Sequence, residues 1–210
     1  DVCVNNPVTT LVGTVTVGNG GIWAGGNGTY LPSGRTMTGQ NMNLIYRLSV
    51  GEQAFGSGSI LGFTLTTTGN GVCPAGASTI TGLTLTSPPI VSAGQNAIIC
   101  RNNLRFTLSG SVSGVSSIGR WITRGNGTFL GAGAVNSTIL GDTYRFSSSD
   151  SLAGSVRLVL QSLNNGKCNV VSDSITLTVG PVAQVPLPQA GTDQVVCANN
   201  SRVNLSGALN

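Results

Sequence analysis

Short apolar runs alternate with glycine-rich turns along the whole chain, and the runs follow the period of two that is typical of strands. In one of them Phe106 and Leu108 enclose Thr107, which predicts a strand with one buried and one solvated face. The turns are rich in Gly and Asn, which tolerate the backbone angles of tight turns. We expect strands at 8–17, 29–31, 43–50, 59–68 and 78–87, and again at 104–109, 119–123, 128–129, 144–147, 155–162 and 172–179. No helical periodicity is visible.

The order of these runs repeats with a period of 97 residues. Cys3, Cys100 and Cys197 each begin a Cys-x-Asn-Asn sequence. Eight and ten residues after each cysteine stand a leucine and a glycine: Leu11, Leu108, Leu205, Gly13, Gly110 and Gly207. A fixed period with shared landmarks predicts a tandem array. Seven or so short strands per unit predict an all-β fold of tandem immunoglobulin-like (PKD-like) β-sandwich domains in an extended array.

The period also predicts the domain boundaries. We expect a first unit at 1–91 with its first strand truncated, a second unit at 92–186, and the start of an incomplete third unit at 187–210. Both ends fall inside units, so we expect a segment of a longer array. The connection 180–188 holds three prolines in nine residues, and proline-rich connections are extended and semi-rigid. The sequence therefore predicts a stiff, elongated string of domains.

Charge is sparse, which limits the classes of partner. Only 8% of residues are charged, the formal net charge is +4 and the mean hydropathy is +0.24, a composition that argues against disorder. Arg120 and Arg124 flank Trp121, but no arginine flanks Trp23 in the first unit, so a solvated strand face explains them better than a nucleic-acid-binding stripe. No apolar run approaches the ~18 residues of a membrane span. We expect no nucleic acid partner and no membrane insertion by this segment.

The five cysteines recur in phase with the repeat. Each full unit has one near its start and one in the hairpin after its penultimate long strand, so the phase predicts disulfides Cys3–Cys73 and Cys100–Cys168. Cys197 is then unpaired by truncation, because its partner would lie beyond residue 210. The alternative, Cys73 with Cys100, crosses the unit boundary. Zinc is disfavoured because the chain has no histidine and no Cys-x-x-Cys sequence.

Few groups in the sequence could carry catalysis. The six acids do not recur between the units: Asp1, Glu52, Asp142, Asp150, Asp173 and Asp193. No Ser/His or Cys/His pair can form, and no phosphate-binding glycine motif occurs. Calcium would need clustered carboxylates, and these acids are isolated. We therefore expect no enzyme activity, no catalytic residue, no cofactor and no metal.

Both tryptophans stand at the same phase of the repeat. Trp23 and Trp121 each lie between the paired cysteines of their unit, as the core tryptophan does in immunoglobulin-type sandwiches. An exposed platform that stacks on carbohydrate is the alternative. Because both tryptophans fall in the expected central strand, the core interpretation is preferred.

Two local sequences could be modified. Asp150-Ser151-Leu152 and Asp173-Ser174-Ile175 place a hydroxyl between an aspartate and an aliphatic residue. This resembles the O-glycosylation signal of Bacteroidota, so Ser151 and Ser174 are candidate acceptors. The structural alternatives are a turn cap at Asp150 and an ordinary strand position at Ser174. The Asn-Gly-Thr sequences at 27–29 and 126–128 are explained as hairpin turns.

Several motifs together resemble one class of bacterial surface repeat. They are Val-Cys-Ala-Asn-Asn at 196–200 preceded by Ala-Gly-Thr-Asp-Gln, the tryptophan followed by Gly-Asn-Gly-Thr-Phe at 125–129, and Leu-Thr-Thr-Thr-Gly-Asn-Gly-Val-Cys at 65–73. They resemble the tandem PKD-like, immunoglobulin-like repeats of giant Bacteroidota cell-surface adhesins, in particular the gliding-motility adhesin of flavobacteria. The resemblance implies export by the type IX secretion system and a long filament on the cell surface that grips the substratum and is moved by the gliding motor.

Three functions remain open from the sequence. The first is a structural and adhesive segment whose partners are neighbouring repeats of the same chain and an external surface or polysaccharide, with the type IX secretion and gliding machinery as further partners. The second is a fixed carbohydrate-binding surface protein with a defined ligand for each unit. The third is a non-catalytic accessory array of a large secreted hydrolase. All three place the segment at the cell surface or outside the cell.

Overall fold

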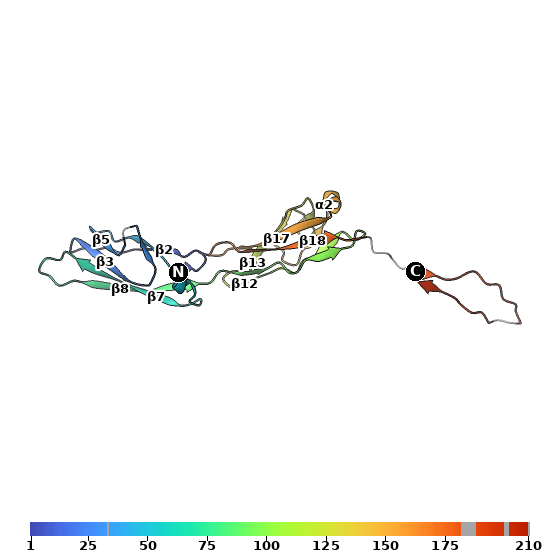
Figure 1. The fold of residues 1–210 in the computed structure, drawn as a ribbon, viewed down its shortest axis with the longest axis horizontal. Helices are drawn as coiled ribbons and strands as arrows, with labels where there is room; N and C mark the ends of the chain where they lie inside the picture. Colours follow the sequence, from blue (N-terminus) through green and yellow to red (C-terminus); the bar gives the residue numbers. More distant parts are fainter. Residues whose placement is uncertain (33, 182–187, 200–201, 210) are drawn as a thin grey trace.

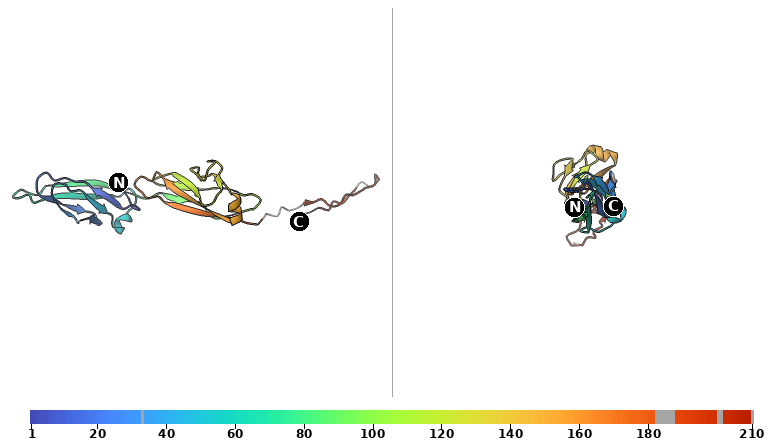
Figure 2. Two further views of the ribbon diagram at one scale, coloured as in Figure 1. Left: turned by 90° about the horizontal axis from the view of Figure 1, so that it is seen from above. Right: turned by 90° about the vertical axis from the view of Figure 1, so that its left-hand side faces the viewer.

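The computed structural model describes residues 1–210 except 33, 182–187, 200–201 and 210. It consists of two β-sandwiches that lie end to end, followed by a thin two-stranded hairpin, and the whole is elongated (Figure 1). The view turned by 90° about the long axis shows the same end-to-end order (Figure 2, left). The all-β prediction is therefore confirmed.

The first sandwich packs a five-stranded sheet on a three-stranded one. The larger sheet has the order β1 (Val2–Cys3), β8 (Ala77–Thr86), β7 (Ile60–Thr68), β3 (Gly20–Gly25) and β5 (Thr36–Thr38). The smaller has the order β2 (Val8–Leu11), β6 (Leu44–Arg47) and β4 (Thr29–Leu31). All pairs are antiparallel except β1 with β8, which run in parallel.

The second sandwich repeats this topology strand for strand. Its larger sheet is β10 (Ala97–Ile99), β18 (Ser172–Val179), β17 (Ser155–Leu163), β13 (Ile118–Thr123) and β15 (Asn136–Ser137). Its smaller sheet is β11 (Arg105–Thr107), β16 (Thr143–Arg145) and β14 (Thr128–Phe129). A three-stranded sheet facing a sheet built on three central antiparallel strands is the immunoglobulin-like sandwich. Each unit thus has the predicted fold.

Two pairs of short strands show the 97-residue period in the pairing of the backbone. β9 (Ile90–Ser92) pairs with β12 (Ser111–Ser113), so residues 90 and 91, which the prediction assigned to the first unit, pair with the second. β19 (Pro188–Gln189) pairs with β20 (Ala208–Leu209) in the same register shifted by 97 residues. The predicted boundary at 186–187 and most of the proline-rich connection lie outside the described residues.

The two cores are built alike around a tryptophan. Trp23 is 1% exposed and donates from Nε1 to the Met42 carbonyl at 2.8 Å, and Trp121 is fully buried and donates to the Leu140 carbonyl at 3.0 Å. The core interpretation is confirmed, and the carbohydrate platform is excluded because no tryptophan face reaches solvent. The recurring glycines lie directly beneath the rings. A Cβ at Gly110 would stand 2.6 Å from the Trp121 ring, and one at Gly13 2.8 Å from the Trp23 ring.

Two short helices were not expected from the sequence. α1 (Val50–Gln53) and α2 (Ser148–Ala153) occupy the same place in their units, each between the small sheet and the next long strand. Each begins with a capping box, in which a serine and an acid three residues later exchange hydrogen bonds, Ser49 with Glu52 and Ser147 with Asp150. The predicted strand at 43–50 therefore ends early, at Arg47. The predicted strand at 8–17 likewise ends at Leu11.

Candidate functional site

The most distinctive site joins the two sandwiches. Cys3 of the first unit forms a disulfide with Cys168 of the second, across a sequence separation of 165 residues. Cys168 lies in the hairpin between β17 and β18, at the end of the second unit that faces the first. The predicted bonds Cys3–Cys73 and Cys100–Cys168 are therefore wrong, and the alternative Cys73–Cys100 does not form either, since Cys73 and Cys100 are both free.

Strand direction explains why the predicted pairing fails. Because β1 runs parallel to β8, Cys3 lies opposite Thr86, the last residue of that strand. Cys73 precedes the first residue of the same strand. Ten residues of strand at about 3.3 Å each separate the two cysteines by roughly 30 Å, whereas a disulfide needs Cα atoms within about 7 Å. The start cysteine thus lies at the junction end of its unit, and the hairpin cysteine at the opposite end.

Hydrogen bonds surround the disulfide. Asn169 donates its backbone N–H to Asn5 Oδ1 at 3.0 Å and its Nδ2 to the Asn5 carbonyl at 2.6 Å, and Asn5 Nδ2 donates to the Asn169 carbonyl at 3.3 Å. Asn6 Nδ2 donates to the Lys167 carbonyl at 3.0 Å. Asp1 and Lys167 form an ion pair of 3.4 Å, but both side chains are more than half exposed, so it contributes little.

These contacts explain the repeated Cys-x-Asn-Asn sequence. All three of its fixed residues in the first unit, Cys3, Asn5 and Asn6, bond to the hairpin of the second unit. Interfaces between domains of one chain usually allow relative motion. A covalent bond with four hydrogen bonds around it restricts that motion at this joint. The sequence is thus a docking motif between units, a role that the repeat period alone did not indicate.

A second recurring site is a buried carboxylate, and here the expectation that the acids do not recur is wrong. Glu52 is 1% exposed and accepts hydrogen bonds from Tyr46 Oη at 2.6 Å and the Asn27 N–H at 2.9 Å. Asp150 is 4% exposed and accepts from Tyr144 Oη and the Asn126 N–H, both at 2.8 Å. The two acids are equivalent although one is longer than the other.

The Asn-Gly-Thr sequences belong to this site. They do not form hairpins as expected, because β3 and β4, like β13 and β14, lie in different sheets. Each turn crosses from one sheet to the other and is held by the tyrosine and the acid below it. Gly28 donates its N–H to Tyr46 Oη at 2.6 Å, and Gly127 donates to Tyr144 Oη at 3.0 Å. The recurrence of the sequence is therefore structural.

Hydrogen bonding decides the charge of these acids. Burial by itself would raise the pKa of Glu52, but hydrogen bonds from Tyr46, Asn27 and Ser49 lower it below its ordinary value. The pKa of Asp150 is lowered in the same way by hydrogen bonds. Burial, with the neighbouring carboxylate, raises the pKa of Tyr144 to about 12. Each site thus holds a carboxylate that accepts hydrogen bonds from several donors, which suits a structural role.

Asp142 is a third buried carboxylate, present in the second unit. It is 4% exposed and accepts from Ser137 Oγ at 2.7 Å and from the Gly131 N–H at 2.7 Å. Burial opposes its charge, but these bonds hold its pKa below the ordinary value. Within the described part of the chain no group of three or more His, Cys, Asp or Glu side chains could hold a metal ion.

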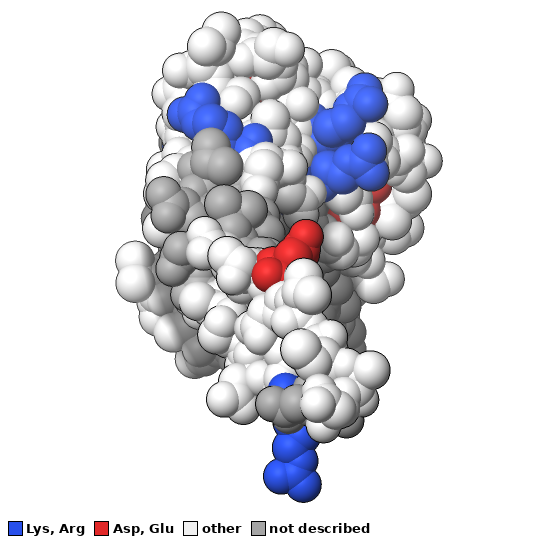
Figure 3. Space-filling model, turned by 90° about the vertical axis from the view of Figure 1, so that its right-hand side faces the viewer, with Lys and Arg blue, Asp and Glu red and all other residues white. Residues whose placement is uncertain are grey.

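The structure also shows how the arginine next to Trp121 in β13 lies relative to that tryptophan. Trp121 points into the core while Arg120, its strand neighbour, is half-buried on the other face, so the two cannot form a shared face for a nucleic acid. On the end of the molecule seen in Figure 3 the charged side chains form a few separate groups among uncharged atoms. No helix among the described residues is long and apolar enough to cross a membrane.

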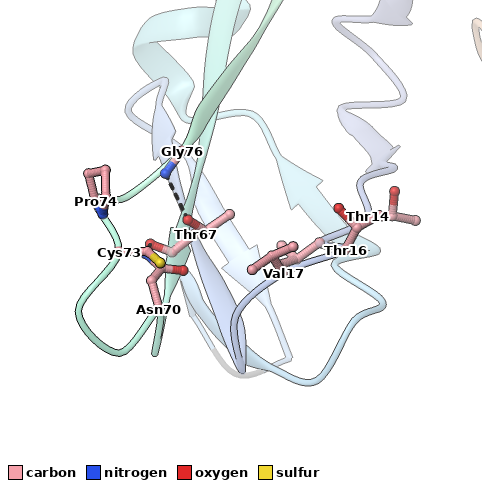
Figure 4. A pocket seen from close by; sticks show the side chains of 9 residues that line it. Thr14, Thr16, Val17, Thr67, Asn70, Cys73, Pro74 and Gly76 are labelled. Atoms are coloured by element: carbon pink, nitrogen blue, oxygen red, sulfur yellow. Dashed lines mark hydrogen bonds between the residues drawn. The ribbon is translucent and has the colours of Figure 1, made fainter.

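A groove of about 320 Å³ lies on the first unit between the segment 14–17 and the β7–β8 hairpin. Thr14, Thr16 and Val17 line one side, and Asn70 and Cys73 line the other (Figure 4). In the second unit the equivalent segment is β12, which pairs with β9.

Of the remaining predicted residues, Ser151 directly follows Asp150 of the buried-acid site, whereas Ser174 and Cys197 lie elsewhere. Ser151 is in the first turn of α2 and half-buried, and Ser174 is in β18, half-buried, where its Oγ accepts from Arg157 Nε at 3.1 Å. Both structural alternatives therefore hold at these positions, and modification of the two serines stays a prediction. Cys197 is free and exposed.

Comparison with known proteins adds similarity of shape only. No model of a known protein family matches the chain, and no curated protein matches its sequence. Similar solved structures include an I-band fragment from titin, with 14% identity and TM-score 0.41, covering 90% of this chain and 63% of that one. Extracellular domains 3–5 of Drosophila OTK give 13% identity and TM-score 0.39, covering 85% of this chain and 58% of that one. Drosophila N-cadherin EC1-4 gives 9% identity and TM-score 0.39, covering 85% and 46%. The chain therefore spans less than two thirds of each of these three.

Proposed function

We propose that the chain is a structural and adhesive segment of a long cell-surface filament, whose tandem sandwiches transmit tension. The observation that carries this proposal is the joint between the units, where Cys3–Cys168 and the hydrogen bonds of Asn5 and Asn6 tie two sandwiches end to end. A disulfide is durable in an oxidising environment, as found outside the cell. Its position at a domain junction favours a load-bearing role.

The path of tension supports this role. Force applied to the two ends enters at Asp1, crosses the Cys3–Cys168 bond and leaves along β18, which is already nearly the last strand of the second unit. The residues between the two cysteines, which include both tryptophan cores, are bypassed by this covalent path. A spacer built in this way can keep its folded length under load. A binding module with one ligand for each unit would not require it.

The finer parts of the proposal rest on the sequence resemblance. We include in it attachment to an external surface or polysaccharide, export by the type IX secretion system, and transport by the gliding machinery. The units themselves supply extended length, and their large uncharged surface is compatible with weak polymer contact. The alternatives, a fixed carbohydrate-binding surface protein or an accessory array of a secreted hydrolase, make different predictions about where the protein is found.

The test is surface imaging of live cells of the source organism with an antibody against residues 1–180. Signal that travels along the cell supports the motile filament. Static surface signal removes gliding from the proposal and leaves a fixed stalk or adhesin. Signal found only in the medium overturns the proposal in favour of the accessory array of a hydrolase.

O-glycosylation of Ser151 and Ser174 is a separate part of the proposal. Both serines are partly exposed and follow an aspartate. Mass spectrometry of the protein purified from the source organism should find a glycan on the peptides that contain them. Replacing Ser174 by Ala should remove the glycan from that peptide alone, and unmodified peptides at both positions would contradict the idea.

A further inference from the structure

Two faces of the molecule repeat the halves of the observed joint, and among the described residues their cysteines are free. The first is the far end of the second unit, where Cys100 follows β10, and β10 runs parallel to β18 as β1 does to β8. The Asn103 N–H donates to the Cys100 carbonyl at 2.9 Å, and the Asn6 N–H donates to the Cys3 carbonyl at 3.0 Å. Cys100, Asn102 and Asn103 are all exposed. This end therefore has the backbone of the docking motif and presents its side chains to solvent.

The second face is the far end of the first unit, at the β7–β8 hairpin. The Cys73 N–H donates to the Asn70 carbonyl at 3.2 Å, as the Cys168 N–H donates to the Asn165 carbonyl at 3.0 Å. The glycine after each asparagine has a positive φ, 64° in one hairpin and 59° in the other. Cys73 is exposed at the edge of the groove, beside Asn70 (Figure 4). This hairpin therefore has the backbone of the one that already carries a disulfide.

We propose that Cys100 and Cys73 are the two open halves of the same joint, and that the array is crosslinked between consecutive units throughout. The start cysteine of each unit bonds to the hairpin cysteine of the next one. Cys100 then takes the hairpin cysteine of a following unit, and Cys73 takes the start cysteine of a preceding unit. The occupant of both faces is thus another repeat of this type. The inference rests on the proposed function in one respect, that further units adjoin these two.

The bond-forming step is an ordinary thiol oxidation. Two thiols lose two protons and two electrons as the sulfur–sulfur bond forms, and the electrons pass to a disulfide-containing oxidant by exchange. Outside the cytoplasm that oxidant is a thiol–disulfide oxidoreductase. In a test tube oxidised glutathione serves instead, and it is reduced to two molecules of glutathione. The exposed thiols of Cys73 and Cys100 meet the requirement for access.

The crosslinks would form two covalent paths that run side by side along the array. One path passes from Cys3 to Cys168, along the chain to Cys197, and onward to a hairpin two units ahead. The other passes from Cys73 along the chain to Cys100 and onward in the same way. Each path uses only about 30 residues of chain for every two units, or roughly 100 Å when fully extended. An array built like this cannot lengthen much even if a sandwich unfolds.

The two open halves are not identical to the occupied ones. Pro74 follows Cys73, whereas Asn169 follows Cys168. Proline has neither a backbone N–H nor a side-chain amide to donate, so the two hydrogen bonds that Asn169 donates to Asn5 have no counterpart at the first hairpin. The crosslink at Cys73 therefore relies on the disulfide and on fewer hydrogen bonds than the joint observed here.

The test is disulfide mapping of the natural protein by mass spectrometry, after iodoacetamide has blocked free thiols. The Cys100→Ser variant releases one thiol, and the position of that thiol identifies the partner. The proposal expects it in the hairpin of the unit that follows residue 210. A released thiol at Cys168 or at Cys73 would overturn the proposal, and so would a wild-type protein in which Cys73 and Cys100 are already alkylated.

The matched control is Cys3→Ser, which should release Cys168. This control keeps the result separate from the proposed function, since disulfide mapping does not depend on where the protein is located or whether it moves. Failure of the surface imaging with successful mapping would leave the crosslinked array intact with another role. Failure of the mapping with moving surface signal would leave the filament and remove the crosslinks.

Discussion

The disulfide between the units should hide most of the chain from mechanical force. If handles are attached at the two ends, force reaches Cys3, crosses to Cys168 and continues along β18. The sequence separation of 165 residues corresponds to an extended length of roughly 550–590 Å at 3.3–3.6 Å per residue. While the bond is intact, unfolding of either core releases none of this length. The double variant Cys3→Ser with Cys168→Ser should release it, less the length of the folded units.

Optical tweezers measure this difference directly. The oxidised wild-type chain should lack the long extension steps, and addition of dithiothreitol should restore them. Cys73→Ser serves as the matched control, because the observed pairing leaves Cys73 out of the force path. If the oxidised chain shows the same long steps as the double variant, or if Cys73→Ser changes the release, the reasoning about the joint is refuted.

Three further outcomes follow from the recurring sites. The pKa values of Glu52 and Asp150 are lowered in the folded state, so the folded form binds fewer protons than the unfolded form. The free energy of unfolding should therefore be at its full value above about pH 5 and fall as the pH drops through the folded-state pKa values. Urea unfolding from pH 7 to pH 2 measures this dependence, and a flat profile would contradict it. Asp150→Asn should cost about 2–3 kcal/mol, because bonds to a charged acceptor are lost, and should reduce that pH dependence; an unchanged profile would mean that Asp150 is not responsible. Gly110→Ala should lower the free energy of unfolding by about 1–3 kcal/mol, because the added Cβ overpacks against the Trp121 ring. The control is Gly141→Ala, whose Cβ would meet nothing closer than 3.8 Å, and it should change stability by less than about 0.5 kcal/mol. Equal effects of the two substitutions would reject the packing argument.

The sequence carried enough information for the fold and the period. Leu108 and Gly110 stand at the same distance from their cysteine as the equivalent residues of the other units. The structure explains this constant spacing, because the leucine is buried and the glycine lies under Trp121. The same shift of 97 residues recurs in the strand pairing of β19 with β20. Periodic landmarks report on core positions because each core imposes the same packing.

The disulfide pairing could not be read from the period. A repeat places every start cysteine and every hairpin cysteine at equivalent positions, so a partner in the same unit and one in the next unit look alike in sequence. The choice depends on the direction of β1, a strand of two residues that pairs in parallel with β8. Such a short strand has no pattern of its own to indicate which end of the unit Cys3 occupies.

The recurring acid was missed for a different reason. Glu52 and Asp150 differ in type, so a comparison of identical residues does not align them. The local signal was present, because each acid stands three residues after a serine, as in a helix-capping box. A search for that pattern would have found both short helices and the acids beneath the Asn-Gly-Thr turns.

Peptide mapping of the oxidised 210-residue chain is the most direct test of the account. Digestion without reduction, after alkylation of free thiols, should yield one crosslinked species that joins the peptide containing Cys3 to the peptide containing Cys168. Cys73, Cys100 and Cys197 should all carry the alkyl group. A crosslink between Cys3 and Cys73, or between Cys100 and Cys168, would contradict the joint between the units and the functions derived from it.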